Sequence, residues 1–402
     1  MKRIISSIII SLTALAGLQS CLSIDGTSDA YGDDLKSVAF VLEPAGEVLD
    51  LGGAILVVKD INAEAVYEAE CGADGSATLK LPCGVYMAMA SISGPDAEYS
   101  GSRSGIIVSG DSKFSIPLNK LLEADIVIRE VYCGGCMKYP QEGTYQSDSY
   151  IILHNNSKKS VFLDGLCFGT LDPYNSNSST VWDVEADYVP IIQAIWQFPG
   201  GGKDFPLGSG EDAIIAVRGA IDHSAYYPMS VNLNRPDVFT CYNPVYFPNS
   251  IYHPAPGPLV KLERYMQVVV KTGQANAYTL SINSPAIVIF RAPEGQSIQG
   301  FLELEGSIVQ KPGSQSDRIV LLPLEWVVDG VEVFNGESAS NKKRLNARVD
   351  ASYITQSKTF EGHSLIRRVD EEKSSVRGYE VLADTNNSSN DFYESEKQSL
   401  RD

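Results

Sequence analysis

Histidine is scarce in this chain of 402 residues, which has four: His154, His223, His253 and His363. They form neither an HExxH pair nor another close metal-ligand spacing, and the chain has no GxSxG elbow and no phosphate-binding glycine loop. A catalytic base would therefore have to be assembled across the fold. The plainest interpretation places these histidines on the surface or in turns.

Positive charge is also in short supply. The chain has 32 Lys and Arg against 50 Asp and Glu, which gives a formal net charge of −18. A protein that binds nucleic acid needs a basic face to meet the phosphates. The composition therefore disfavours a nucleic-acid partner.

Long apolar runs are lacking beyond the N-terminus, and none could span a bilayer. Residues 1–20 predict a lipoprotein signal peptide, because Lys2 and Arg3 precede a short apolar run that ends in Leu18-Gln19-Ser20-Cys21. That ending resembles a bacterial lipobox, which implies that Cys21 is acylated, with palmitate among the acyl chains, and tethers the protein to a membrane. The alternative is an ordinary cleaved signal with a chance cysteine.

Residues 21–35 are small, polar and acidic, and they predict a flexible tether. The acidic run loosely resembles a surface-export signal of lipoproteins, although it is interrupted. This favours an outer-membrane lipoprotein on the cell surface over one that faces the periplasm.

The remaining cysteines number six: Cys71, Cys83, Cys133, Cys136, Cys167 and Cys241. Cys133 and Cys136 have CxxC spacing, but no second CxxC exists to complete a four-cysteine zinc site. The pair also follows a strand, whereas a redox pair is typically activated at a helix N-terminus. A structural disulfide or buried thiols are favoured, and a metal site and redox catalysis are the alternatives.

Convincing helix signals are missing, and strand signals are frequent. Residues 36–122 contain about seven short apolar or alternating runs separated by Gly, Asp and Pro, which predicts an Ig-like β-sandwich. Its segment 73–94 resembles prealbumin-like or carboxypeptidase-regulatory-like modules, with a turn at Asp74-Gly75. Residues 123–402 predict a larger β domain with strands at 161–166, 213–219, 266–272, 277–282, 286–292, 301–306 and 318–324. The polar end, residues 384–402, is expected to run over the surface or fray.

Two loop regions could carry a site. Residues 236–258 combine six prolines with six aromatic rings, five from Phe and Tyr and one from His253, a composition that excludes regular helix and central strand. Tyr242, Tyr246, Phe247 and Tyr252 are the candidate ligand or partner surface, and the alternative is that these rings pack against the sandwich.

The other region is a cluster of carboxylates at Asp164, Asp172, Asp183, Glu185 and Asp187. A calcium ion could use several of them, because it prefers six to eight oxygen ligands. The spacing does not match an EF-hand, so a solvated acidic loop is favoured. We expect no metal and no cofactor to be needed.

The stretch 125–169 is the core of the main domain. It predicts strands at 126–131, 150–153 and 161–163, with turns at Asn155-Asn156-Ser157 and Asp164-Gly165. Its pieces IREVYCGG, SDSYIILHNNS and VFLDGL resemble the opening of a lamin-tail-like domain. With the pieces at 198–217, 220–223, 342–345, 362–368 and 384–392, it resembles an uncharacterised family of Bacteroidetes lipoproteins, in which an Ig-like domain precedes a lamin-tail-like one.

The resemblance implies an all-β, lipid-anchored protein of the outer membrane and no known activity. We expect a non-enzymatic binding or interaction protein that assists a TonB-dependent receptor in nutrient capture, with a glycan or small nutrient as a further ligand. The alternatives are a hydrolase of glycan or peptide with its site in the main domain's loops, and a structural or adhesive surface lipoprotein.

Overall fold

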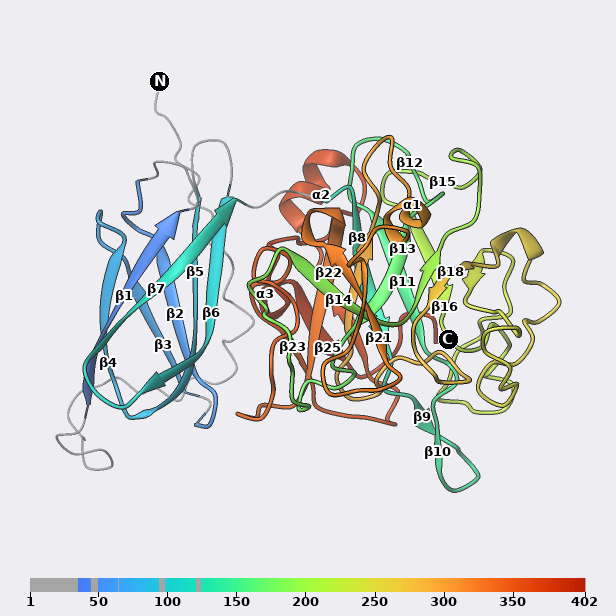
Figure 1. Ribbon diagram of the computed structural model, residues 1–402, viewed down its shortest axis with the longest axis horizontal. Helices are drawn as coiled ribbons and strands as arrows, with labels where there is room; N and C mark the ends of the chain where they lie inside the picture. The colour runs from blue at the N-terminus through green and yellow to red at the C-terminus, as the bar shows by residue number, and fades with distance from the viewer. Residues whose placement is uncertain (1–34, 45–49, 64, 94–97, 121–123, 402) are drawn as a thin grey trace.

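The computed structural model describes residues 35–44, 50–63, 65–93, 98–120 and 124–401. The signal peptide, Cys21 and nearly all of the tether lie outside the described residues. The described chain forms two β-rich bodies that follow one another in sequence, visible at the left and right of Figure 1.

The first body is a seven-stranded β structure with the order β3-β2-β5-β6-β7-β1-β4. Its strands are β1 (Lys36–Pro44), β2 (Ile55–Asp60), β3 (Val66–Glu70), β4 (Ser76–Leu81), β5 (Gly84–Ser93), β6 (Glu98–Val108) and β7 (Ser112–Lys120). β1 runs parallel to β7 and antiparallel to β4. The seven runs expected from the sequence all form strands.

Alternation along the strands builds the core of this body. Val38, Phe40 and Leu42 of β1 are buried, and they pack with residues of β2, β5 and β7. The Asp74-Gly75 turn is present, with Gly75 at φ 70° and the Asp74 carboxylate accepting from Ser76. The local signals of residues 36–122 are therefore sufficient to specify this body.

The second body contains two main sheets that pack face to face. A six-stranded sheet has the order β17-β16-β11-β8-β24-β25, and an eight-stranded sheet has the order β20-β21-β14-β13-β19-β22-β23 with β18 paired to β14. The strands of the first sheet are β8 (Ile126–Tyr132), β11 (Tyr150–Asn155), β16 (Asp212–Ala216), β17 (Val238–Thr240), β24 (Ser364–Arg367) and β25 (Phe392–Ser395). Those of the second are β13 (Cys167–Leu171), β14 (Tyr188–Gln197), β18 (Gln267–Lys271), β19 (Ala286–Phe290), β20 (Ile308–Gln310), β21 (Arg318–Pro323), β22 (Val327–Asn335) and β23 (Ile354–Gln356).

Apolar side chains fill three layers around these sheets. The central core joins Ile128 and Ile151 of the six-stranded sheet to Trp196 and Ile289 of the eight-stranded sheet. Two outer clusters cover the far faces of the two sheets. Because both of its faces are covered, β11 is buried at every position instead of alternating.

Several expectations for this body are wrong in detail. Residues 161–163 do not add a third strand to the main sheet, because β12 (Val161–Phe162) pairs only with β15 (Pro206–Leu207). Residues 277–282 form a loop with buried Tyr278 and Leu280, and residues 301–306 lie in a short helix and a turn. In each case the apolar residues reflect burial, which loops and short helices share with strands.

Helices are present but short. They are α1 (Ile298–Leu302), α2 (Glu371–Arg377) and α3 (Ser388–Asp391), with 3₁₀ turns at Leu262–Arg264 and Leu324–Trp326. Asp370 caps the first turn of α2, and Gly378 ends the helix in the left-handed conformation. Helices of about two turns or less have too few residues to show a 3.6-residue hydrophobic period. The sequence pattern therefore could not predict them.

The C-terminal segment is part of the fold, and the expectation that it frays is wrong. β25 forms the edge of the six-stranded sheet, paired with β24. Ser388 and Asp391 are buried, and the side chain of Gln398 donates to the carbonyl oxygen of Met229. Polar residues are buried here because each finds a hydrogen-bond partner.

The two bodies touch through a small contact. Met87 of β5 packs with Phe334 and Tyr353, whose rings stack at 4.1 Å between centroids. Lys59 of β2 forms an ion pair with Glu337. Each body nevertheless keeps a separate large core.

Candidate functional site

The two cysteines of the CxxC segment are free thiols in the structure. Cys133 follows β8 and its sulfur lies 3.4 Å from Oε1 of Gln356, whereas Cys136 begins the ribbon β9 (Cys136–Met137) paired to β10 (Thr144–Tyr145). Both side chains are buried. Of the interpretations left open by the sequence, buried thiols describe this structure and a disulfide does not.

Close packing explains the two glycines between these cysteines. A Cβ on Gly134 would collide with the side-chain amide of Gln356. Gly135 has a φ of 69°, and a Cβ there would strike the carbonyl oxygen of Tyr145. The CGGC segment is therefore a tight turn between β8 and β9, and its spacing results from the turn.

Cys136 belongs to a buried polar cluster centred on Asp148. Tyr132 and Ser230 donate to Oδ2 of Asp148 at 2.9 and 2.6 Å, and the sulfur of Cys136 lies 3.6 Å from the same oxygen. Burial, with the nearby Asp148 charge, raises the pKa of Cys136 to about 12. The thiol therefore stays neutral at physiological pH and is a poor nucleophile.

His223 extends this cluster through Tyr145. Its Nε2 lies 2.7 Å from the carbonyl oxygen of Gly219, so Nε2 carries the proton and Nδ1 accepts from the hydroxyl of Tyr145 at 2.6 Å. Burial lowers the pKa of His223. The imidazole is neutral and fully committed to these two partners.

Arg218 connects the cluster to the aromatic loop, residues 236–258. Its Nη1 donates to the carbonyl oxygen of Gln146 at 2.6 Å, and its guanidinium carbon lies 4.8 Å from the centroid of the Tyr252 ring. Asp148 is one of the charges that act on it. The structure thus brings Cys136 and Tyr252, which the sequence singled out separately, to opposite sides of one cluster.

The aromatic loop divides its rings between core and surface. Phe247 is 2% exposed and stacks on Trp196 at 5.6 Å and on His253 at 5.8 Å, so its assignment to the surface is wrong. Tyr242 is half-buried against Tyr265 at 5.9 Å.

Tyr246 and Tyr252 are 43% and 40% exposed, so these two side chains reach solvent. Among the described residues, seventeen large apolar side chains are exposed, and seven of them lie between residues 226 and 262. These seven are Tyr226, Val245, Tyr246, Ile251, Tyr252, Leu259 and Leu262. We call residues 226–262 the exposed apolar segment; it forms much of the yellow region at the right of Figure 1. Single exposed apolar residues are ordinary, but seven of them within 37 residues make this segment the candidate contact surface.

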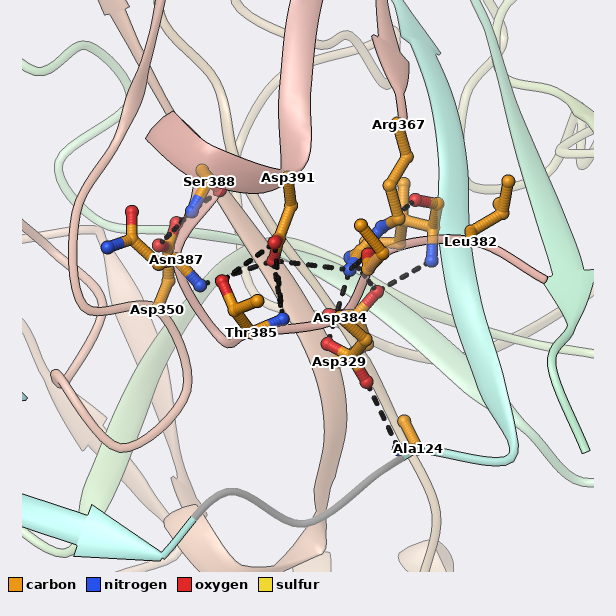
Figure 2. Close-up of polar contacts among 12 residues, drawn as sticks. Ala124, Asp329, Asp350, Arg367, Leu382, Asp384, Thr385, Asn387, Ser388 and Asp391 are labelled. Atoms are coloured by element: carbon orange, nitrogen blue, oxygen red, sulfur yellow. Dashed lines mark hydrogen bonds and ion pairs between the residues drawn. The ribbon is translucent and has the colours of Figure 1, made fainter. Parts of the chain in front are cut away.

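A second buried polar cluster surrounds Arg367 (Figure 2). Its guanidinium forms ion pairs with Asp329 at 2.6 Å, Asp384 at 3.2 Å and Asp391 at 3.6 Å, and all four side chains are almost fully buried. Burial, with the charge of Asp384, raises the pKa of Asp391 to about 7, although Arg367 opposes this shift. The guanidinium fills the centre of this acidic cluster.

Other segments that resemble the family, residues 198–217 and 342–345, also take part in buried polar contacts. Arg344 of KKRL pairs with Glu332 at 2.6 Å, and both side chains are fully buried. Asp164 accepts from the backbone of Gly202, Asp204 and Phe205 and so fixes the glycine-rich loop that contains these residues. The segments that resemble the family therefore specify the fold.

The expected acidic cluster does not converge. Asp172 pairs with Lys311 at 2.7 Å, whereas Asp187 is exposed beside Arg348. Among the described residues, no group of three or more His, Cys, Asp or Glu could hold a metal ion.

The expectation that the histidines lie on the surface or in turns holds only in part, because His223 and His253 take part in turns, with Tyr226 and Asn249 respectively, but are not on the surface. His154, His223 and His253 are buried, and His154 lies 2.7 Å from Asp212 and 2.9 Å from the carbonyl oxygen of Glu380. His363 is half-buried beside Glu394. Their hydrogen-bond partners depend on tertiary contacts between distant segments, which the sequence does not display.

The geometry therefore defines an all-β protein with stabilising polar clusters and one exposed apolar segment. Residues 209–399 match the family model described as "Protein of unknown function (DUF4876)". A DUF4876 family protein from Bacteroides thetaiotaomicron has a similar structure, with a TM-score of 0.57 and 27% identity over 89% of this chain and 94% of that chain. The resemblance to an uncharacterised family of Bacteroidetes type is confirmed.

A DUF3823 family protein from Parabacteroides merdae also matches, at 10% identity and a TM-score of 0.18 over 38% of this chain and 72% of that chain. No curated protein matches the sequence. No helix in the described part of the chain is long and apolar enough to cross a membrane.

Proposed function

We propose that this is a lipid-anchored binding protein of the bacterial cell surface that assists a TonB-dependent receptor in nutrient capture. Lys2, Arg3 and the LQSC sequence that ends at Cys21 support the anchor. The similar Bacteroides protein supports the bacterial setting. The exposed apolar segment is the observation that carries the binding role.

Buried side chains and hydrogen bonds to the rest of the domain hold this segment in place, which suits it to binding. Phe247 is buried beneath the aromatic loop, and Nε2 of His253 lies 2.7 Å from the carbonyl oxygen of Tyr278. The backbone NH of Asn249 also donates to the carbonyl oxygen of Asn276. Because such a loop loses little conformational entropy on binding, exposed Tyr246 and Ile251 can act as anchors at low cost.

The geometry gives less support to the hydrolase alternative. The thiol of Cys136 and the imidazole of His223 are buried and hydrogen-bonded, and the carboxylates around Arg367 are held by that cation. These clusters offer no accessible nucleophile beside a free base. No specific observation favours a purely adhesive role over partner binding.

A pull-down of the lipidated protein from its own membrane tests the proposal. The double variant Tyr246→Ala and Ile251→Ala removes two exposed side chains, and Leu304→Ala with Val376→Ala removes two others outside the segment. We expect the native chain and the second variant to capture the receptor, and the first to lose capture at an unchanged Tm. Equal capture by all three would reject the binding surface.

A further inference from the structure

We propose that Arg218 recognises a carboxylate that the partner protein presents to the exposed apolar segment beside Tyr252. This rests on the proposed function and adds the chemistry of the recognised group.

Three arginines are buried in the described part of the chain: Arg218, Arg344 and Arg367. Arg344 is paired with Glu332, and Arg367 is paired with three carboxylates. Arg218, which is 4% exposed, has no carboxylate within ion-pair distance among the described residues. A buried charge without a partner is unfavourable, so Arg218 is the exception that needs an explanation.

The nearest candidate, Asp148, does not satisfy Arg218. Its Oδ2 accepts from Tyr132 and Ser230, and its Oδ1 has no hydrogen-bond partner. Nε of Arg218 also has no partner. The two groups therefore act on each other through space, without a direct hydrogen bond.

The open edge of Arg218 has the right form for a carboxylate. The guanidinium carbon lies over the Tyr252 ring, and Nη1 donates to the carbonyl oxygen of Gln146, which leaves the Nε–Nη2 edge without a hydrogen bond in the described structure. Such an edge binds a carboxylate through two parallel in-plane hydrogen bonds. The cation–π contact with Tyr252 does not compete, because it takes up none of the N–H hydrogen bonds of the guanidinium.

Tyr252 also supplies the connection to the surface. Its ring contacts Arg218, yet it is 40% exposed, and Ile251 beside it is 80% exposed. A partner side chain that carries a carboxylate next to apolar groups could contact both the exposed segment and Arg218. Movement of the Tyr252 ring would uncover the guanidinium that lies over it.

Thermal melting of the full chain with a capped glutamate, and separately with glucuronate, tests this inference at ionic strength matched with NaCl. We expect capped glutamate to raise the Tm of the native chain and of Arg348→Met, a control at an exposed arginine outside the segment that is already paired with Asp187. Arg218→Met should show no rise with capped glutamate, because it lacks the two-donor edge.

Arg218→Lys covers the case in which the methionine variant does not fold. Lysine keeps the charge but lacks the two-donor edge, so the rise with capped glutamate should fall at least severalfold. An equal rise in the native chain and these variants, or no rise in the native chain, would overturn the inference. A rise with glucuronate alone would overturn the assignment to a partner protein.

The same variants in the membrane pull-down separate the two proposals. If Arg218→Met loses capture together with Tyr246→Ala and Ile251→Ala, both proposals stand. If only the double variant loses capture, the surface stands and the role of Arg218 fails.

Discussion

At the scale of single residues, the buried acidic groups around Arg367 outnumber the positive charge that pairs with them. Asp329, Asp384 and Asp391 surround the one guanidinium of Arg367. Burial outweighs the attraction of Arg367 at Asp391, and its pKa rises to about 7. The folded protein therefore holds a proton there at a pH at which the unfolded chain has released it.

This proton makes stability depend on pH. Between about pH 4 and pH 7 the folded state binds more protons at Asp391 than the unfolded state, so its contribution to stability falls as pH rises and is constant above pH 7. Asp391→Asn should remove this loss, which is about 2–3 kcal/mol of unfolding free energy between pH 5 and pH 8 in the native chain. Denaturant unfolding at both values measures it. Asp183→Asn, at an exposed site, is the control, and the same pH slope in all three proteins would contradict the account.

The thiols give a second test at this scale. Burial raises the pKa of Cys133 and of Cys136 to about 12, whereas Cys83 is exposed. Iodoacetamide should modify Cys83 in the native protein at pH 8 and leave Cys133 and Cys136 unmodified until denaturant is added. Peptide mass spectrometry reports each site. A Cys133–Cys136 disulfide in the native protein would contradict the structure.

At the scale of elements, neighbouring rings of the aromatic loop have different roles: one stabilises the loop from inside, and the other is exposed for contact with a partner. Phe247 fills space between Trp196 and His253, whereas Tyr246 next to it faces solvent. Phe247→Ala should lower the free energy of unfolding by about 3–5 kcal/mol because it leaves a cavity. Tyr246→Ala should change it by less than about 0.5 kcal/mol. Chemical denaturation compares them, and similar losses in the two variants would reject this division.

The same loop shows what sequence reasoning can predict. Its proline and aromatic content identified it as irregular and as a candidate site. Alternation identified β1, and short apolar runs identified β8 and β11. Burial of Phe247 was missed because neighbouring aromatics carry no period inside a loop. The Arg218 site was missed because its parts, Tyr145, Asp148, Arg218 and Tyr252, meet only in the folded chain. No local sequence pattern predicts that residues from these separate segments come into contact.

At the scale of the whole molecule, two cores are joined by a small contact around Met87, Phe334 and Tyr353. A fragment of residues 36–122 should therefore melt cooperatively by itself, at a somewhat lower temperature than in the full chain because the contact is lost. Circular dichroism on heating measures this. A disordered spectrum would place the boundary elsewhere.

The central claim is that the exposed apolar segment binds a partner at the cell surface. The most direct measurement places a photo-crosslinking amino acid at Tyr246 in the full-length lipidated protein, expressed in its own cells, with the same substitution at exposed Leu304 as the control. Irradiation should join position 246, but not position 304, to a TonB-dependent outer-membrane receptor. No adduct from position 246, or the same adduct from both positions, would contradict the account.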